Sequence, residues 1–380
     1  MTTIRILQVF TSMGRGGAES MIMNYYRRID RSKIQFDFLV HRQERAAFDD
    51  EIEQLGGTIY RLRPIDPFFP STYYSELRAF FKQHNNYNVI HSHLNTFSYF
   101  PLKIAQEYNI STRIAHAHIA MDSINIKKAL TSKSNIIEAL KKIVKLRLKK
   151  KIHTHTTHYF SCGEKAGKWL FGNKTDFYTM NNAIDSKKFA FNKMTSIALK
   201  KEYGLENNIV LGHIGRFTYQ KNHLYLLKIL AELVKNKDSY VMVLIGDGPH
   251  QQKIKEAAEV MGLGRHVKFL GLKTNIAELL QMIDIFVFPS IYEGLPVTLI
   301  EAQAAGLKIL ASDTITTEVT LTNGIIFLSI EKPVNIWCKE ILQLGLTQKK
   351  NNTKLIIKGN YDIENNCREI EKFYHNQNLK

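Results

Sequence analysis

The chain has few of the features that place a protein in a membrane or outside the cell. It has only three cysteines, Cys162, Cys338 and Cys367, which are too few and too widely spaced for a disulfide framework. We therefore expect reduced thiols in a cytoplasmic protein. No run approaches the roughly 18 consecutive apolar residues of a membrane-spanning helix. The N-terminal MTTIRILQVFTSMG lacks the basic flank and the long apolar stretch of a signal peptide.

Acidic residues are scarce relative to basic ones, 35 against 52, which gives a net charge of +17. The segment Lys127 to Lys151 holds ten Lys or Arg against one acid, Glu138, and so contributes +9. Apolar residues recur between these charges at helical spacing: Ile136, Leu140, Ile143, Val144 and Leu148. A basic amphipathic helix is typical of proteins that lie on an anionic membrane, and the alternative is a solvated surface helix. The segment has no interleaved aromatics and no nucleic-acid module, so we expect no nucleic-acid partner.

Short apolar runs alternate with helix-like segments along the chain. The runs are IRILQVF, IQFDFLV, TIYRL, NVIHSH and STRIAHAH, and then NIVLGHIG, SYVMVLIGDG, HVKFLG, DIFVFPS and LKILAS. Such alternation predicts an α/β protein with parallel sheets covered on both faces. Because 380 residues exceed what one core usually organises, we expect two Rossmann-like domains. Residues 1–190 form the first, residues 191–360 the second, and residues 361–380 a C-terminal amphipathic helix.

The loop SMGRGGAES follows the first apolar run and opens a helix. In sheets of this class ligands bind beyond the carboxyl ends of the strands. The glycines, among them Gly16 and Gly17, let the backbone approach a ligand, and the N–H groups of a helix N-terminus favour an anion. Glu19 stands where a dinucleotide fingerprint has its third glycine, so that fingerprint is excluded. We expect contact with a phosphate or a sugar, and the alternative is a tight turn.

Two further loops follow strands of the second half. HIGRFTYQKNH places Arg216 just past a strand and Lys221 five residues later, where two cations could neutralise a diphosphate or could be solvated surface charges. VLIGDGPH ends a strand in a turn that opens a helix or lines a base pocket. No Asp-x-Asp pair occurs in the chain, so we expect no metal ion at the diphosphate.

Histidines occur in pairs two residues apart: His91 and His93, His116 and His118, His153 and His155. In a strand such pairs face the same side, which could suit a metal ion. The chain lacks the accompanying acids and a cysteine cluster, so we expect hydrogen-bonded histidines instead. At the carboxyl end of its strand, His118 is the best placed to contact a ligand.

The stretch FPSIYEGLPVTLIEAQAAG carries Glu293 and Glu301 on either side of a predicted helix start. Gly294 and Pro296 suggest that the helix begins between the two glutamates and ends at Gly306. Glu293 is then in the loop and Glu301 is inside the helix. On its own, this pair would be interpreted as surface charge.

These motifs occur in a fixed order: Gly-Arg-Phe with Lys221, the Gly-Asp-Gly-Pro turn, and Glu293-Gly-Leu-Pro through Glu301. Together with GRGGAE, NVIHSH, RIAHAH, YFSCGEKAGKWLFG and NNAID, they resemble the family 4 retaining glycosyltransferases of the GT-B fold. The resemblance covers nearly the whole chain and is greatest to bacterial capsular or exopolysaccharide glycosyltransferases. It implies two Rossmann-like domains facing across a cleft, with the C-terminal helix crossing back to the first domain.

The resemblance also implies a role for each candidate residue. Arg216 and Lys221 would neutralise the diphosphate of a nucleotide-sugar donor, and Gly16 and Gly17 would add backbone contacts. Glu301 would accept hydrogen bonds from the ribose.

The transferred sugar would be held by Glu293 together with the backbone N–H groups of Gly294 and Leu295. His118 would contact the same sugar, and His116 is an open alternative for this contact.

The implied reaction moves a hexose or N-acetylhexosamine from a nucleotide sugar, expected to be a UDP-sugar, to a lipid-linked surface polysaccharide. It proceeds with retention, without metal or cofactor, at the inner face of the plasma membrane. Two alternatives are a UDP-sugar epimerase on the same fold and a non-catalytic basic membrane-binding protein. The intact set Arg216, Lys221, Glu293 and Glu301 argues against the second of these.

Overall fold

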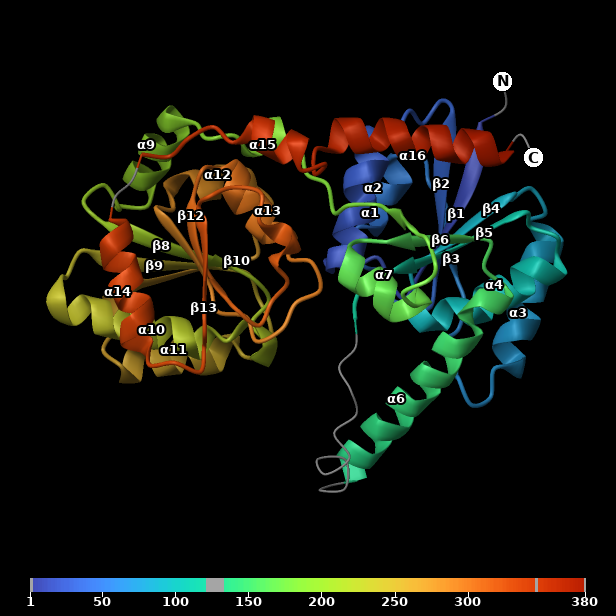
Figure 1. Cartoon of the computed structure of the whole chain (residues 1–380), viewed down its shortest axis with the longest axis horizontal. Helices are drawn as coiled ribbons and strands as arrows, with labels where there is room; N and C mark the ends of the chain where they lie inside the picture. The colour runs from blue at the N-terminus through green and yellow to red at the C-terminus, as the bar shows by residue number, and fades with distance from the viewer. Residues whose placement is uncertain (1–2, 121–132, 346–347, 379–380) are drawn as a thin grey trace. The chain divides into compact units, whose positions relative to one another are not determined.

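The computed structural model describes residues 3–120, 133–345 and 348–378, which form two compact units, each built around one sheet (Figure 1). Within the described residues, the first unit runs to Ala183 and takes in the residues from Ile363 onward, and the second runs from Ile184 to Asp362. Every strand pair in both sheets is parallel. The predicted α/β class with two parallel sheets is therefore confirmed.

The first unit contains a seven-stranded sheet in the order β3-β2-β1-β4-β5-β6-β7. Its strands are β1 (Ile4–Phe10), β2 (Ile34–Val40), β3 (Ile59–Arg61), β4 (Val89–Ser92), β5 (Thr112–Ala117), β6 (His158–Ser161) and β7 (Tyr178–Thr179). Its helices are α1 (Gly17–Arg28), α2 (Asp49–Gln54), α3 (Ser71–Gln83), α4 (Tyr99–Glu107), α6 (Lys133–Lys151), α7 (Glu164–Phe171) and α16 (Ile363–Asn378), with short 3-10 turns η1 (Asn95–Ser98) and η2 (Ile152–Thr154). The central strands are almost continuously buried because helices cover both faces of the sheet.

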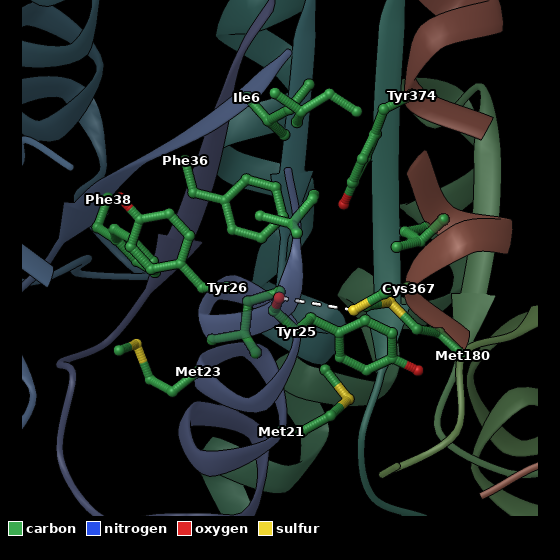
Figure 2. Packing of buried hydrophobic residues seen from close by; sticks show 14 of the residues in the cluster. Ile6, Met21, Met23, Tyr25, Tyr26, Phe36, Phe38, Met180, Cys367 and Tyr374 are labelled. Carbon is green, nitrogen blue, oxygen red and sulfur yellow. Dashed lines mark hydrogen bonds between the residues drawn. The ribbon is translucent and has the colours of Figure 1, made fainter. Parts of the chain in front are cut away.

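The C-terminal helix α16 is part of the core of the first unit. Figure 2 shows Cys367 and Tyr374 of α16 among the side chains of α1, β1 and β2. The Cys367 thiol donates to the carbonyl of Tyr25 over 3.6 Å. The Tyr374 ring meets the Phe36 ring edge-on, at 5.9 Å between centroids. Because these side chains are buried, α16 contributes apolar burial to the first sheet, which is the dominant stabilising term for such a unit.

The second unit contains a six-stranded sheet in the order β10-β9-β8-β11-β12-β13. Its strands are β8 (Ile209–Ile214), β9 (Tyr240–Ile245), β10 (Val267–Gly271), β11 (Ile285–Phe288), β12 (Lys308–Ser312) and β13 (Ile325–Leu328). Its helices are α8 (Ser186–Phe189), α9 (Lys193–Glu202), α10 (His223–Asn236), α11 (Gln251–Val260), α12 (Ile276–Met282), α13 (Val297–Ala304), α14 (Val334–Leu344) and α15 (Thr353–Lys358), with 3-10 turns η3 (Tyr219–Lys221), η4 (Gly264–His266) and η5 (Thr317–Val319).

The strand order of the second sheet changes direction at one position. From β8 the chain continues to β9 and β10 on one side, while β11, β12 and β13 lie on the other side. The strand order therefore reverses between β8 and β11. In open parallel sheets this switch point is where the loops diverge and a ligand can enter.

Candidate functional site

The loops that follow β8 and β11 carry most of the residues predicted for the donor, and they meet at the switch point of the second sheet. Arg216 and Lys221 follow β8, and Glu293 follows β11. The Ile291 N–H donates to the carbonyl of Gln220 over 2.8 Å, and the Asn222 side chain donates to the carbonyl of Pro289 over 3.2 Å. The two loops are thus tied together by backbone and side-chain hydrogen bonds.

Lys221 and Glu293 form an ion pair. The Lys221 ammonium lies 2.7 Å from one carboxylate oxygen of Glu293, with the side chains 15% and 9% exposed. Gln220 donates to the other carboxylate oxygen over 3.1 Å, and the ammonium lies 4.7 Å from the centre of the Phe288 ring. Sequence analysis gave the two charges separate tasks and did not predict this contact. The pair holds both side chains in place because each compensates the charge of the other in a partly buried setting.

The Gly-Asp-Gly-Pro turn packs against the Gly-Arg-Phe segment. The Phe217 N–H donates to the carbonyl of Asp247 over 2.9 Å. Gly246 has φ +136°, and a Cβ there would lie 2.2 Å from the carbonyl oxygen of Gly215. Gly248 has φ +157°, and a Cβ there would lie 2.6 Å from the carbonyl oxygen of Phe217. Both glycines are therefore required by close backbone approach, which supports the structural explanation of this motif.

Arg216 and Glu301 are the two predicted donor ligands whose charges are not paired. The Arg216 side chain is exposed and has no ion-pair partner within residues 3–120, 133–345 and 348–378. The Glu301 carboxyl lies inside α13, with no hydrogen-bond partner in the same described ranges. Burial raises the pKa of Glu301 to about 7, and the positive charge of Lys188 opposes this rise.

The start of α13 agrees with the prediction. Pro296 caps the helix, which begins at Val297, and Gly306 with φ +74° follows its end. Gly294 and Leu295 lie in the loop between Glu293 and this start.

At the start of α1, Gly16 is the cap residue and Gly17 the first helical residue. The side chain of Glu19 folds back so that a Cβ on Gly16 would lie 2.2 Å from its carboxylate oxygen. Burial raises the pKa of Glu19. Apart from its chain neighbours and the backbone of its own helix, no described residue lies within 4 Å of the position that a Cβ would take on Gly17. A side chain could therefore be added at Gly17, but at Gly16 only if the Glu19 side chain moved.

Four of the predicted histidines gather at the carboxyl ends of β4 and β5 in the first unit. His91 Nε2 lies 3.0 Å from His116 Nδ1, and His93 Nδ1 lies 2.9 Å from His118 Nε2. The remaining members of the network are Gln8 of β1 and Tyr374 of α16, which sequence analysis missed. The signal for Gln8 was present, because it is an uncharged polar residue inside the apolar run IRILQVF.

All four histidines are kept neutral by their surroundings. Burial lowers the pKa of His91, His93 and His116 well below the usual value, and it lowers that of His118 to about 3. Ligand atoms of His91, His93 and His116 lie within 4.8 Å of one another, which is close enough to consider a metal ion. A metal ion would have to break the hydrogen bond between His91 and His116, whose ring nitrogens point at each other. The geometry fits a hydrogen-bonded network better than a ligand set.

His153 and His155 do not join this network. His153 contacts the hydroxyl of Tyr159 over 3.1 Å, and His155 contacts the side chain of Gln106 over 2.6 Å. These are hydrogen-bonded histidines, as expected.

The predicted basic helix is α6, which Figure 1 shows extending beyond the rest of the first unit. Lys127 and Lys128 lie outside the described residues. Leu140, Ile143 and Leu146 are 49%, 39% and 39% exposed and lie among the lysines of this helix. No helix among the residues that the structure describes has both the length and the apolar character needed to cross a bilayer.

Comparison with known proteins gives consistent matches. Residues 196–336 match the family model described as glycosyl transferases group 1. EpsF of Bacillus subtilis (strain 168), named as a glycosyltransferase, is 34% identical over 98% of this chain and 96% of its own length. The capsular polysaccharide biosynthesis glycosyltransferase CapH of Staphylococcus aureus is 25% identical over 82% of this chain and 81% of its own.

Solved structures share the fold. The structure of Anabaena Alr3699/HepE in complex with UDP and glucose aligns with a TM-score of 0.73 at 17% identity, over 98% of this chain and 100% of that one. At this identity the similarity concerns the fold alone, which is the GT-B fold.

Proposed function

Because the chain belongs to the group 1 glycosyl transferases and is similar over its length to glycosyltransferases of polysaccharide biosynthesis, we propose that it is a retaining family 4 enzyme. It transfers a hexose or N-acetylhexosamine from a UDP-sugar to a growing, lipid-linked surface polysaccharide. The observation that carries this proposal is the assembly of Arg216, Lys221 and Glu293 on two tied loops at the switch point of the second sheet.

The donor diphosphate is bound by cations in this proposal. Arg216 is exposed and unpaired within the described residues, and Lys221 stands five residues further along the same loop. Each charge-assisted hydrogen bond to a phosphate oxygen contributes about 1.5–3 kcal/mol. Lys221 reaches the diphosphate by sharing or leaving its bond to Glu293. The UDP named for the HepE complex supports a uridine nucleotide.

Glu293 holds the sugar that is transferred. Once Lys221 turns to the diphosphate, the Glu293 carboxylate can accept hydrogen bonds from sugar hydroxyls, with the N–H groups of Gly294 and Leu295 beside it. Glu301 accepts hydrogen bonds from the ribose, and the backbone at Gly16 and Gly17 contributes from the start of α1. In the first unit, His118 contacts the transferred sugar.

The chemical step in this proposal needs no metal ion. The bond between the anomeric carbon and the diphosphate oxygen breaks while an acceptor hydroxyl bonds to the same face of that carbon. The hydroxyl proton passes to the departing diphosphate oxygen, so charge and atoms balance. Arg216 and Lys221 stabilise the negative charge that develops on the leaving group.

The acceptor is proposed to be presented at an anionic membrane, at the cytoplasmic face. Helix α6 combines exposed Leu140, Ile143 and Leu146 with its run of lysines. Each Lys or Arg near such a surface contributes about 1 kcal/mol, so a part of the run suffices for reversible binding.

A panel of nucleotide sugars tests the proposed function. The full chain is incubated with each compound, and thermal stabilisation and slow hydrolysis are measured. A ligand at 100 times its Kd stabilises the folded protein by about 2.7 kcal/mol, which is easily detected. We expect stabilisation and hydrolysis with UDP-sugars. An epimerised UDP-sugar formed without any acceptor would indicate the epimerase instead, and no response to any nucleotide sugar would contradict the proposal.

A further inference from the structure

Gln8 is a fully buried polar residue in the middle of β1, the strand between β2 and β4. A buried amide destabilises a fold unless its donor and acceptor groups are both used. Gln8 uses both ends. Its oxygen lies 2.8 Å from His93 Nε2, and its nitrogen lies 3.4 Å from the hydroxyl of Tyr374.

The amide oxygen determines which ring nitrogens carry protons in one arm of the network, which runs from Gln8 through His93 to His118. It can only accept, so His93 must carry its proton on Nε2 and leave Nδ1 as an acceptor. His93 Nδ1 lies 2.9 Å from His118 Nε2, so that nitrogen of His118 must carry the proton. His118 Nδ1 is then a free acceptor, with no hydrogen-bond partner in the part of the chain that the structure describes.

The amide nitrogen determines which groups donate in the other arm, which runs from Gln8 through Tyr374 and His91 to His116. It donates to the Tyr374 oxygen, so the Tyr374 hydroxyl donates in turn to His91 Nδ1 over 2.7 Å. His91 Nε2 then donates to His116 Nδ1 over 3.0 Å. His116 Nε2 is buried and meets no hydrogen-bond partner among the described residues.

His118 and His116, at the ends of the two arms, differ in whether a ring nitrogen is available to a ligand. His116 is fully buried, and its Nδ1 is occupied by His91. His118 is partly exposed just past the end of β5, and its Nδ1 is unoccupied within the described residues. Only His118 therefore offers an available acceptor at the edge of the sheet where ligands bind.

We propose that Gln8 is a positioning residue of the transferase reaction. Its amide holds the proton of His118 on Nε2, so that Nδ1 accepts a hydrogen bond from a hydroxyl of the substrate. The catalytic role of Gln8 rests on the proposed function, whereas the tautomer of His118 does not depend on it. If Gln8 served only to stabilise the core, the tautomer of His118 would not affect turnover, whereas a hydroxyl donor of the substrate requires an acceptor at Nδ1.

Two substitutions at Gln8 distinguish the effects of its two hydrogen bonds. Gln8→Met removes both hydrogen bonds while keeping an unbranched side chain of similar length. Gln8→Glu keeps an acceptor for His93, so the proton of His118 stays on Nε2. It also offers an acceptor to the Tyr374 hydroxyl, so the order of donors along His91 and His116 reverses.

Histidine tautomers are measured by NMR on ¹⁵N-histidine-labelled full chain, with His118→Gln used to assign the signals. In the unsubstituted protein we expect His118 protonated on Nε2. We expect Gln8→Met to lose this preference, and Gln8→Glu to keep it while moving the proton of His116 to Nδ1. Protonation of His118 on Nδ1 in the unsubstituted protein would overturn the proposal, and this outcome does not depend on the folding of either Gln8 variant.

Kinetics supply the second readout. We expect Gln8→Met to lower kcat by about two- to tenfold, since molecules whose His118 proton has moved to Nδ1 cannot accept the hydrogen bond from the substrate. UDP affinity should change less than twofold, and Gln8→Glu should recover most of kcat. Unchanged kcat in Gln8→Met would overturn the positioning role. If no sugar is transferred at all, the proposed function fails while the tautomer result stands by itself.

Discussion

The ammonium nitrogen of Lys221 lies 2.7 Å from a carboxylate oxygen of Glu293. These two side chains were predicted to bind different parts of one donor, and the structure pairs them with each other. In the proposed function, a diphosphate would compete with Glu293 for Lys221, and the released carboxylate would become available to a sugar. The ion pair would then couple nucleotide binding to sugar binding.

Lys221→Ala should weaken UDP binding by roughly 10- to 150-fold, because a charge-assisted hydrogen bond of about 1.5–3 kcal/mol is lost. Glu293→Gln should keep UDP binding and lose turnover. Titration calorimetry with UDP and initial rates check both. Unchanged UDP affinity in Lys221→Ala would refute the assignment of this lysine.

The same two positions predict a coupling in stability. Lys221→Ala leaves the partly buried Glu293 carboxylate without its cation, so the single variant should unfold more easily than the double variant with Glu293→Gln. The free energies of unfolding in urea are compared for the two single variants, Lys221→Ala and Glu293→Gln, and for the double variant. Additive effects would mean that the ion pair contributes nothing to the fold.

Glu301→Gln should raise stability at pH 8 while weakening donor binding. The pKa of Glu301 is raised from 4.5 to about 7 in the folded protein. A carboxyl with a raised pKa destabilises the folded state above that pKa, and the effect disappears as the pH falls to the unfolded value. The variant should exceed the unsubstituted protein by about 2–3 kcal/mol at pH 8, with the difference vanishing near pH 4.5. Thermal unfolding at several pH values tests the trend, and a difference independent of pH would contradict it.

Gly246→Ala should destabilise the second unit by about 2 kcal/mol or more. The Cβ would lie 2.2 Å from the carbonyl oxygen of Gly215, at a φ of +136°. Gly204→Ala is a matched control, because Gly204 has φ +63° but no described residue within 4 Å of the added carbon. We expect only about 1 kcal/mol there. Equal losses in denaturant unfolding would show that close packing at the turn is unimportant.

Neutralising five of the described lysines of α6 should reduce binding to anionic vesicles. The variant carries glutamine in place of Lys141, Lys142, Lys149, Lys150 and Lys151. Five substitutions should remove up to about 5 kcal/mol of attraction at low salt. Co-sedimentation with phosphatidylglycerol vesicles measures the effect. The control variant replaces five exposed lysines of the second unit: Lys237, Lys253, Lys273, Lys339 and Lys354. Equal binding by the two variants would mean that α6 is a solvated surface helix with no part in membrane binding.

Sequence alone predicted the class of the fold because alternation of apolar runs and helical segments extends over the whole chain. It missed β6, β7 and β13, which have four, two and four residues. Pairing with a neighbouring strand decides the conformation of these segments, and a local sequence pattern does not specify that pairing.

The candidate site was predicted as a set of loops but not as a set of contacts. The motifs placed Arg216, Lys221 and Glu293 at strand ends, where the structure also has them. The bond between Lys221 and Glu293 joins residues 72 apart, and that between Gln8 and Tyr374 joins residues 366 apart. Such pairs depend on how strands are ordered in the sheet, which local pattern does not specify.

The place of Tyr374 on α16 has a consequence for how the protein is made. Tyr374 completes the histidine network of the first unit, yet the whole second unit is translated before it. At about 5–20 residues per second, the first sheet waits many seconds on the ribosome for its last helix. We expect the apolar surface that α16 later covers to be exposed during that interval, and the second unit to fold as an insertion before the first unit is complete.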